Sequence, residues 1–144
     1  MLDRDTVMDT VNKAYAARRL GDKEALRRYF APDAVFRMVG RSSLLGGLAV
    51  GPADAATAVD HLIDLFRFHE MTQERVIVDG QTVMIHWKVM TSTGGGDCVD
   101  TELCDILTVD DDGKVARVDE FADTALLAHM LASGPAKSPS VAQD

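Results

Sequence analysis

The sequence predicts an α+β fold, a cone-shaped barrel in which a curved antiparallel sheet wraps around N-terminal helices. Apolar residues recur at helical spacing in the N-terminal part of the chain. From Met71 the period changes to two, which is the period of strands. Asp-Gly and Gly-Gly-Gly turns separate the later strands and join them as hairpins. Helices and strands are therefore segregated along the chain, as is typical of α+β proteins, and a sheet wrapped around helices leaves an interior.

Turn and capping residues mark the ends of the predicted helices. Gly21 suits the left-handed turn that closes a first helix, and Asp22 is a good N-cap for a second. Pro32 ends that second helix, and Pro52 stands at the favoured first position of a third, with a last helix near the C-terminus. The predicted helices span residues 6–20, 23–30, 52–68 and 124–132.

Alternating polarity predicts five strands, at residues 34–39, 70–79, 81–93, 97–110 and 113–122. Residues 40–51 contain four glycines among aliphatic side chains, so we interpret them as a flexible apolar loop that acts as a lid over a pocket. An ordered packing loop is the alternative. Residues 133–144 have too little apolar surface to order themselves. We expect one domain over residues 1–132 and a flexible tail over residues 133–144.

Composition excludes several function classes for this chain of 144 residues. It has 15 Lys and Arg against 23 Asp and Glu, for a net charge of −8. No basic footprint is present, so we expect no nucleic acid and no membrane among its partners. No apolar run approaches the roughly 18 residues of a membrane-spanning helix, and the N-terminus has no secretory apolar region. We expect a cytoplasmic protein.

Two acids interrupt otherwise apolar rows on neighbouring predicted strands. Asp105 shares one face of its strand with Leu103 and Leu107, and Glu120 shares one face of the next strand with Val118. A carboxylate in such a row is costly unless it is paired, hydrogen-bonded or protonated. Carboxyls whose environments separate their pKa values are the usual groups of acid/base catalysis. Asp105 and Glu120 are therefore candidate catalytic residues.

Alternation alone leaves two interpretations of these acids open. They face a shared cavity, or they lie on a solvated or dimer-facing side and pair with Lys88, Arg117 or another cation. Tyr15 lies on the inner stripe of the first predicted helix, where its hydroxyl can donate into the same cavity. We count Tyr15 as a third catalytic candidate, with simple core filling as the alternative.

The expected pocket wall is apolar. Trp87 shares its row with other apolar residues and is predicted to be a core or wall residue rather than a catalytic one. The wall and ligand-binding residues are predicted to be Trp87, Phe36, Met38, Leu103, Leu62 and Phe66. The four histidines have no metal-ligand spacing with another His or Cys, and no phosphate-cradling loop is present. We therefore expect no metal and no cofactor.

Five short stretches carry a resemblance to a known family. They are AARRLGDKEAL at residues 16–26, YFAPDAVF at 29–36, DILTV at 105–109, DGKV at 112–115 and EFAD at 120–123. Over residues 5–132 the chain resembles SnoaL-like, ketosteroid isomerase-like members of the nuclear transport factor 2-like superfamily. The resemblance implies a cone-shaped α+β fold. The resemblance does not indicate one activity, because that superfamily includes isomerases, cyclases, hydrolases, dehydratases and non-catalytic domains.

The resemblance also has implications residue by residue. Asp105 matches the strand aspartate that ketosteroid isomerases keep protonated, and Glu120 matches a second pocket acid of epoxide hydrolases. Tyr15 falls one residue from the isomerases' helix tyrosine. The isomerases' base aspartate falls on Met38, and the arginine of limonene epoxide hydrolase falls on Leu103. Neither parent mechanism is therefore complete in this chain.

These observations favour a small-molecule enzyme with an apolar pocket and acid/base chemistry of the isomerase, cyclase or dehydratase type. Its substrate would be a hydrophobic carbonyl or hydroxyl compound. The alternative is a non-catalytic module that binds an apolar ligand or a protein partner. The resemblance also implies a homodimer formed through the back of the sheet, where Met84, His86 and Met90 are expected to lie.

Overall fold

A computed structural model describes residues 1–41 and 48–133, and it has four helices and six strands in the predicted α+β arrangement. The helices are α1 (Arg4–Leu20), α2 (Lys23–Tyr29), α3 (Ala55–Leu65) and α4 (Thr124–Ala132). The strands are β1 (Phe30–Met38), β2 (Gly51–Asp54), β3 (Arg67–Asp79), β4 (Thr82–Ser92), β5 (Val99–Val109) and β6 (Val115–Ala122). Residues 42–47 of the predicted lid (residues 40–51) and residues 134–144 of the predicted tail (residues 133–144) lie outside the described residues.

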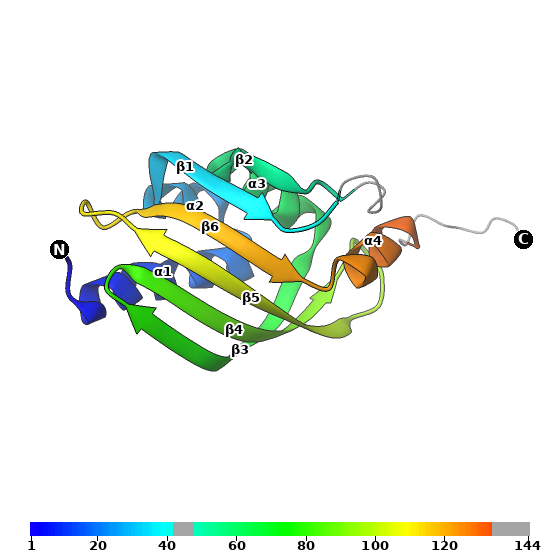
Figure 1. Cartoon of the computed structure of the whole chain (residues 1–144). Coiled ribbons are helices and arrows are strands. Elements are labelled where there is room, and N and C mark those ends of the chain that lie inside the picture. Colours follow the sequence, from blue (N-terminus) through cyan, green and yellow to red (C-terminus); the bar gives the residue numbers. More distant parts are fainter. Residues whose placement is uncertain (42–47, 134–144) are drawn as a thin grey trace, which may run out of the picture.

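All six strands belong to one curved, open sheet in the order β2-β1-β6-β5-β4-β3. Figure 1 shows α1, α2 and α3 against one face of this sheet, and α4 beyond the end of β6. Every neighbouring pair is antiparallel except β1 and β6, which run parallel. The expectation of a purely antiparallel sheet is wrong at this pair. Short hairpin connections join β3 to β4, β4 to β5 and β5 to β6, so these neighbours are antiparallel. Strands β1 and β6 are separated by most of the chain, and such a long connection permits parallel pairing.

Capping confirms the corner between the first two helices. The chain at Gly21 has φ 72°, and its N–H reaches the carbonyls of Ala17 and Arg18, which closes α1. The Asp22 side chain then accepts a hydrogen bond from the backbone N–H of Ala25 and opens α2. Because the left-handed turn redirects the chain at once, α2 begins only two residues after Gly21.

The predicted start of the third helix is wrong. Residues 51–54 are extended and pair with β1, with Pro52 opposite Arg37. The helix begins at Ala55, where the Asp54 side chain accepts from the backbone N–H of Thr57. Proline suits this short strand because β2 is the edge of the sheet, where a missing N–H costs little.

Two other helix ends come earlier than predicted. Helix α2 ends at Tyr29 because Phe30 is extended (φ −93°, ψ 141°) and already begins β1, which therefore contains Pro32. Helix α3 ends at Leu65 because Phe66 is extended (φ −127°, ψ 117°), and β3 follows directly. The last helix has the predicted bounds. Within the described residues, no helix is long and apolar enough to cross a membrane.

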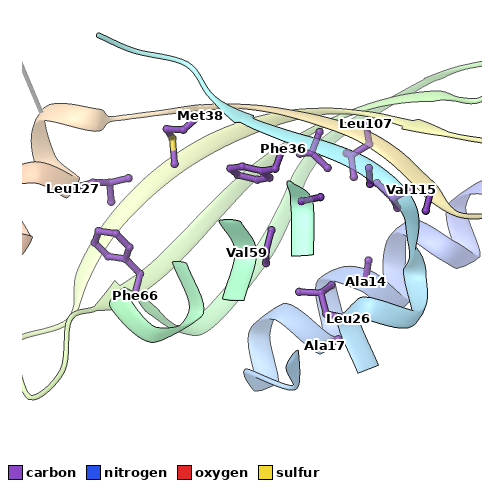
Figure 2. Close-up of a cluster of buried hydrophobic side chains, with 14 of the residues drawn as sticks. Ala14, Ala17, Leu26, Phe36, Met38, Val59, Phe66, Leu107, Val115 and Leu127 are labelled. Atoms are coloured by element: carbon purple, nitrogen blue, oxygen red, sulfur yellow. The ribbon is translucent and has the colours of Figure 1, made fainter. Parts of the chain in front are cut away.

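The buried apolar side chains form two clusters on the concave side of the sheet. The larger lies between the sheet, α2, α3 and α4, and Figure 2 shows Phe36, Met38, Phe66 and Leu127 gathered within it. The smaller lies where the first half of α1 crosses β4 and β5. Tyr15 packs against both clusters. The tyrosine predicted to point inward therefore lies at the junction of the two cores.

Candidate functional site

One row of inward-facing residues crosses four strands and contains both predicted acids. Asp105 on β5 is directly opposite Glu120 on β6 and, on its other side, opposite Ile85 on β4. Glu120 is in turn opposite Met38 on β1. Directly opposed residues of neighbouring strands point to the same face of a sheet. The two carboxyls therefore lie side by side, with an apolar side chain on each flank.

Asp105 is buried, with 2% of its surface exposed. The hydroxyl of Tyr15 donates a hydrogen bond of 2.5 Å to its Oδ2 atom. Burial raises the pKa of the Asp105 carboxyl well above its usual range, and the charge of Glu120 raises it further. The hydrogen bond from Tyr15 and the charge of Arg18 act in the opposite direction. The Oδ1 atom of Asp105 is buried and has no hydrogen-bond partner among the described residues. The interpretation in which Asp105 pairs with a surface cation is therefore wrong.

Glu120 lines the same cavity from β6. Burial raises the pKa of its carboxyl above the usual range, while the positive charge of Arg18 acts to lower it. Two carboxyls that face the same apolar cavity from neighbouring strands do not both ionise cheaply, so they titrate as a coupled pair. Once such a pair has lost its first proton, it contains one acid and one base.

Tyr15 connects this pair to the smaller core. Burial and the Asp105 charge raise the pKa of its phenol well above the usual value, so the phenol is a proton donor at neutral pH. Its ring packs on the Trp87 indole, with ring centroids 4.7 Å apart and tilted by 53°. The buried N–H of Trp87 has no hydrogen-bond acceptor among the described residues.

Arg18 is a site residue that the sequence analysis missed. It follows Tyr15 by three residues on α1 and lines the cavity with it. Burial lowers the pKa of its guanidinium to about 10, against the raising effect of Glu120 and Asp105, so the group stays charged at neutral pH. The signal was present, since Arg18 continues the buried stripe of Val11 and Ala14 at helical spacing.

The cavity has a volume of about 70 Å³. Five of the six side chains predicted for its wall do line it, namely Phe36, Met38, Leu62, Phe66 and Leu103. Trp87 does not, because it lies behind Tyr15 in the smaller core. The volume is below the roughly 150 Å³ of an engineered cavity that takes benzene, so a larger ligand needs wall side chains to move.

A model of the SnoaL-like domain matches residues 11–118, which is most of the chain and includes Tyr15, Arg18 and Asp105 but ends before Glu120. The chain belongs to the SnoaL-like domain family. The predicted family and the predicted fold class are both confirmed. No curated protein sequence matches this SnoaL-like chain.

Solved structures share the fold of this SnoaL-like domain. TerC, co-crystallised with polyporic acid, has a TM-score of 0.71 and 18% identity, covering 88% of this chain and 98% of TerC. A candidate SnoaL-like polyketide cyclase from Jannaschia sp. has a TM-score of 0.69 and 17% identity, covering 94% and 100%. An LEH-like epoxide hydrolase from M. tuberculosis has a TM-score of 0.68 and 19% identity, and the match covers 92% of this chain and 94% of the hydrolase. At these identities the likeness shows the fold alone.

The two departures from the parent mechanisms lie in the wall of the SnoaL-like cavity. Met38 is 2% exposed and lies beside Glu120. Leu103 is 7% exposed and lies two residues before Asp105 on β5. The histidines are elsewhere, and His86 contacts Glu102 at 2.5 Å on the opposite face of the sheet. Within residues 1–41 and 48–133, no group of His, Cys, Asp or Glu is arranged to hold a metal ion.

Proposed function

We propose that this chain is an enzyme that moves protons on a small apolar carbonyl or hydroxyl compound. The observation that carries the proposal is the pairing of Asp105 with Glu120 in an apolar cavity, with the Tyr15 hydroxyl bonded to Asp105. We assign the catalytic roles to Asp105, Glu120 and Tyr15. A site that contains both a protonated acid and a carboxylate base next to a phenol donor supports acid/base chemistry better than nucleophilic or metal chemistry.

The step common to isomerisation, cyclisation and dehydration is proton removal next to a carbonyl. The ionised carboxylate of the pair takes a proton from the carbon beside the substrate carbonyl, and the electron pair moves onto the carbonyl oxygen. The protonated partner or Tyr15 donates to that oxygen and stabilises the enolate. Return of the proton to another carbon completes an isomerisation. Attack of the enol carbon on a second carbonyl closes a ring, and loss of water follows in a dehydration.

Exchange of carbon-bound hydrogen provides a test that does not require the natural substrate. Small enolisable ketones such as cyclopentanone are incubated with the protein in heavy water, and proton NMR follows loss of the α-hydrogen signal. We expect protein-dependent exchange, a fall of about 10²-fold or more in Asp105→Asn, and smaller falls in Glu120→Gln and Tyr15→Phe. Asp100→Asn is the matched control, because Asp100 is exposed on the same strand. Unchanged exchange in Asp105→Asn contradicts the proposal.

A non-catalytic binding module is the second candidate, and Met38 is the observation that favours it. Met38 is buried in the cavity wall next to Glu120, at the position where the resemblance places a base. A thioether cannot accept a proton under these conditions. If apolar ligands bind equally well to the wild type and to Asp105→Asn, and neither protein exchanges hydrogen, the binding module replaces the enzyme.

We also propose that the chain forms a homodimer through the outer face of the sheet. Three apolar side chains are exposed there on different strands: Ile77 (54%), Met84 (39%) and Phe121 (42%). Ile77 and Met84 are directly opposite each other on β3 and β4. Exposed apolar side chains clustered on a sheet face favour contact with a second protein surface. The same face carries His86, as the sequence analysis expects of a dimer interface.

A further inference from the structure

The position of Arg18 is determined by its contacts at the end of α3. Its Nη2 atom donates to the carbonyl oxygens of Phe66 at 3.1 Å and Leu62 at 3.4 Å. The guanidinium carbon lies 3.7 Å from the centroid of the Phe68 ring. These contacts hold the head group in one place. They leave the Nη1 and Nε donors without a hydrogen-bond acceptor among the described residues.

The charges that face this cavity come from few groups. Helix α1 supplies Arg18 and the neutral phenol of Tyr15, and β5 and β6 supply Asp105 and Glu120. Glu102 also borders the cavity, but its carboxylate contacts His86 on the outer face. Helix α3 and strand β3 contribute no ionisable side chain to the lining within the described residues. With one proton on the carboxyl pair, the cavity holds one positive and one negative charge.

These two charges are not in contact. Among the described residues, no nitrogen of Arg18 lies within 4.0 Å of an oxygen of Asp105 or Glu120. Arg18 therefore balances the carboxyl pair across the cavity instead of forming an ion pair with it. A guanidinium with unpaired donors beside a largely apolar cavity is poorly satisfied, and an anionic oxygen is the partner that best matches its planar, forked donors.

We propose that Arg18 determines the specificity of this cavity, and that the ligand is an apolar molecule with one anionic oxygen group, a carboxylate or an ionised enol, which binds the guanidinium. The apolar body of the ligand then lies against the acid pair and Tyr15. This proposal rests on the ligand-binding part of the proposed function and names its substrate class. Because a second negative charge enters a cavity whose charges otherwise cancel, the Asp105–Glu120 pair takes up a proton as the ligand binds.

A matched pair of small probes tests this assignment. The carboxylate 2-methylpropanoate and the amide 2-methylpropanamide have nearly the same shape and differ in charge. Binding to the full chain is measured by NMR titration and by calorimetry. We expect the carboxylate to bind about tenfold or more tightly than the amide. Calorimetry near neutral pH in buffers of different ionisation enthalpy is expected to report uptake of about one proton with the carboxylate and none with the amide.

Two arginines on one helix provide the matched variants. Arg18→Met removes the charge and keeps an apolar side chain, whereas Arg19→Met makes the same change at an exposed position. We expect Arg18→Met to lose the preference for the carboxylate and Arg19→Met to keep it, while Arg18→Lys keeps part of it. If Arg18→Met does not fold, the proton uptake of the wild-type protein still tests the proposal.

Several outcomes overturn the proposal: equal binding of the two probes, no binding of either, a carboxylate preference that survives in Arg18→Met, or binding without proton uptake. Failure of the proposed function looks different. Carboxylate preference that depends on Arg18, without hydrogen exchange that depends on Asp105, supports this assignment and contradicts the enzyme. Exchange that depends on Asp105, together with an intact carboxylate preference in Arg18→Met, supports the enzyme and contradicts this assignment.

Discussion

Asp105 and Glu120 are directly opposed on the antiparallel strands β5 and β6, and both side chains reach the same cavity. The burial of both carboxyls makes the stability of the protein depend on pH. Burial raises the pKa of each carboxyl above the ordinary values of 3.8 and 4.5. The folded protein therefore binds more protons than the unfolded chain at pH values above this ordinary range. The free energy of unfolding falls as the pH rises from there through the raised pKa values of the pair.

Replacing one acid is expected to weaken this pH dependence. In Asp105→Asn the Tyr15 hydroxyl keeps an acceptor, and Glu120 ionises without a like charge beside it. We expect the variant to be more stable than the wild type by about 1 to 2 kcal/mol at about pH 8, with a flatter pH profile. Urea unfolding at several pH values measures this. Asp100→Asn should follow the wild-type profile, and a wild-type stability that rises over this range contradicts the paired site.

The hydrogen bond between Tyr15 and Asp105 is expected to hold the Asp105 pKa below the value that burial alone would produce. Tyr15→Phe removes the donor, so the pKa of the carboxyl pair should rise further, and unfolding should become easier by about 1 to 2 kcal/mol. Carbon-13 NMR of the labelled carboxyls follows the titration. Tyr29→Phe is the control, because Tyr29 lies outside the cavity lining. An unchanged titration in Tyr15→Phe would show that the hydrogen bond has no such effect.

The wall formed by Leu127 is expected to limit the size of the ligand. Leu127 projects from α4 toward Met38 and Phe66, as Figure 2 shows, and it lines the cavity. Leu127→Ala should enlarge the cavity and strengthen binding of bulkier apolar ligands, while lowering the free energy of unfolding by about 2 to 3 kcal/mol. Fluorescence of an apolar dye and urea unfolding measure the two effects. Leu126→Ala, which is outside the lining, should leave dye binding unchanged.

The outer sheet face is expected to pair two copies of the chain at micromolar concentration. Met84→Asp places a charge within the exposed apolar set of Ile77, Met84 and Phe121, so it should shift the protein toward a monomer. Light scattering measures the mass. Leu20→Asp is the control, because Leu20 is exposed (71%) at the end of α1. A monomeric wild type excludes this dimer.

Local signals in the sequence predicted much of the fold and part of the candidate site. Glycine and aspartate caps predicted the corner at Gly21 and Asp22, because a cap acts through the backbone of its own few residues. The start of α3 was misplaced because Pro52 suits a helix N-terminus and an edge strand equally well. Only pairing with β1 decides between these two.

For the site, the sequence alone determined that Asp105 and Glu120 each interrupt an apolar row, because side chains alternate along any strand. The tertiary structure decided that the two acids are opposite each other, that Trp87 lies behind Tyr15, and that Arg18 faces the same cavity. Strand register and helix docking depend on packing between segments far apart in the chain. Periodicity within a single segment carries no information about them.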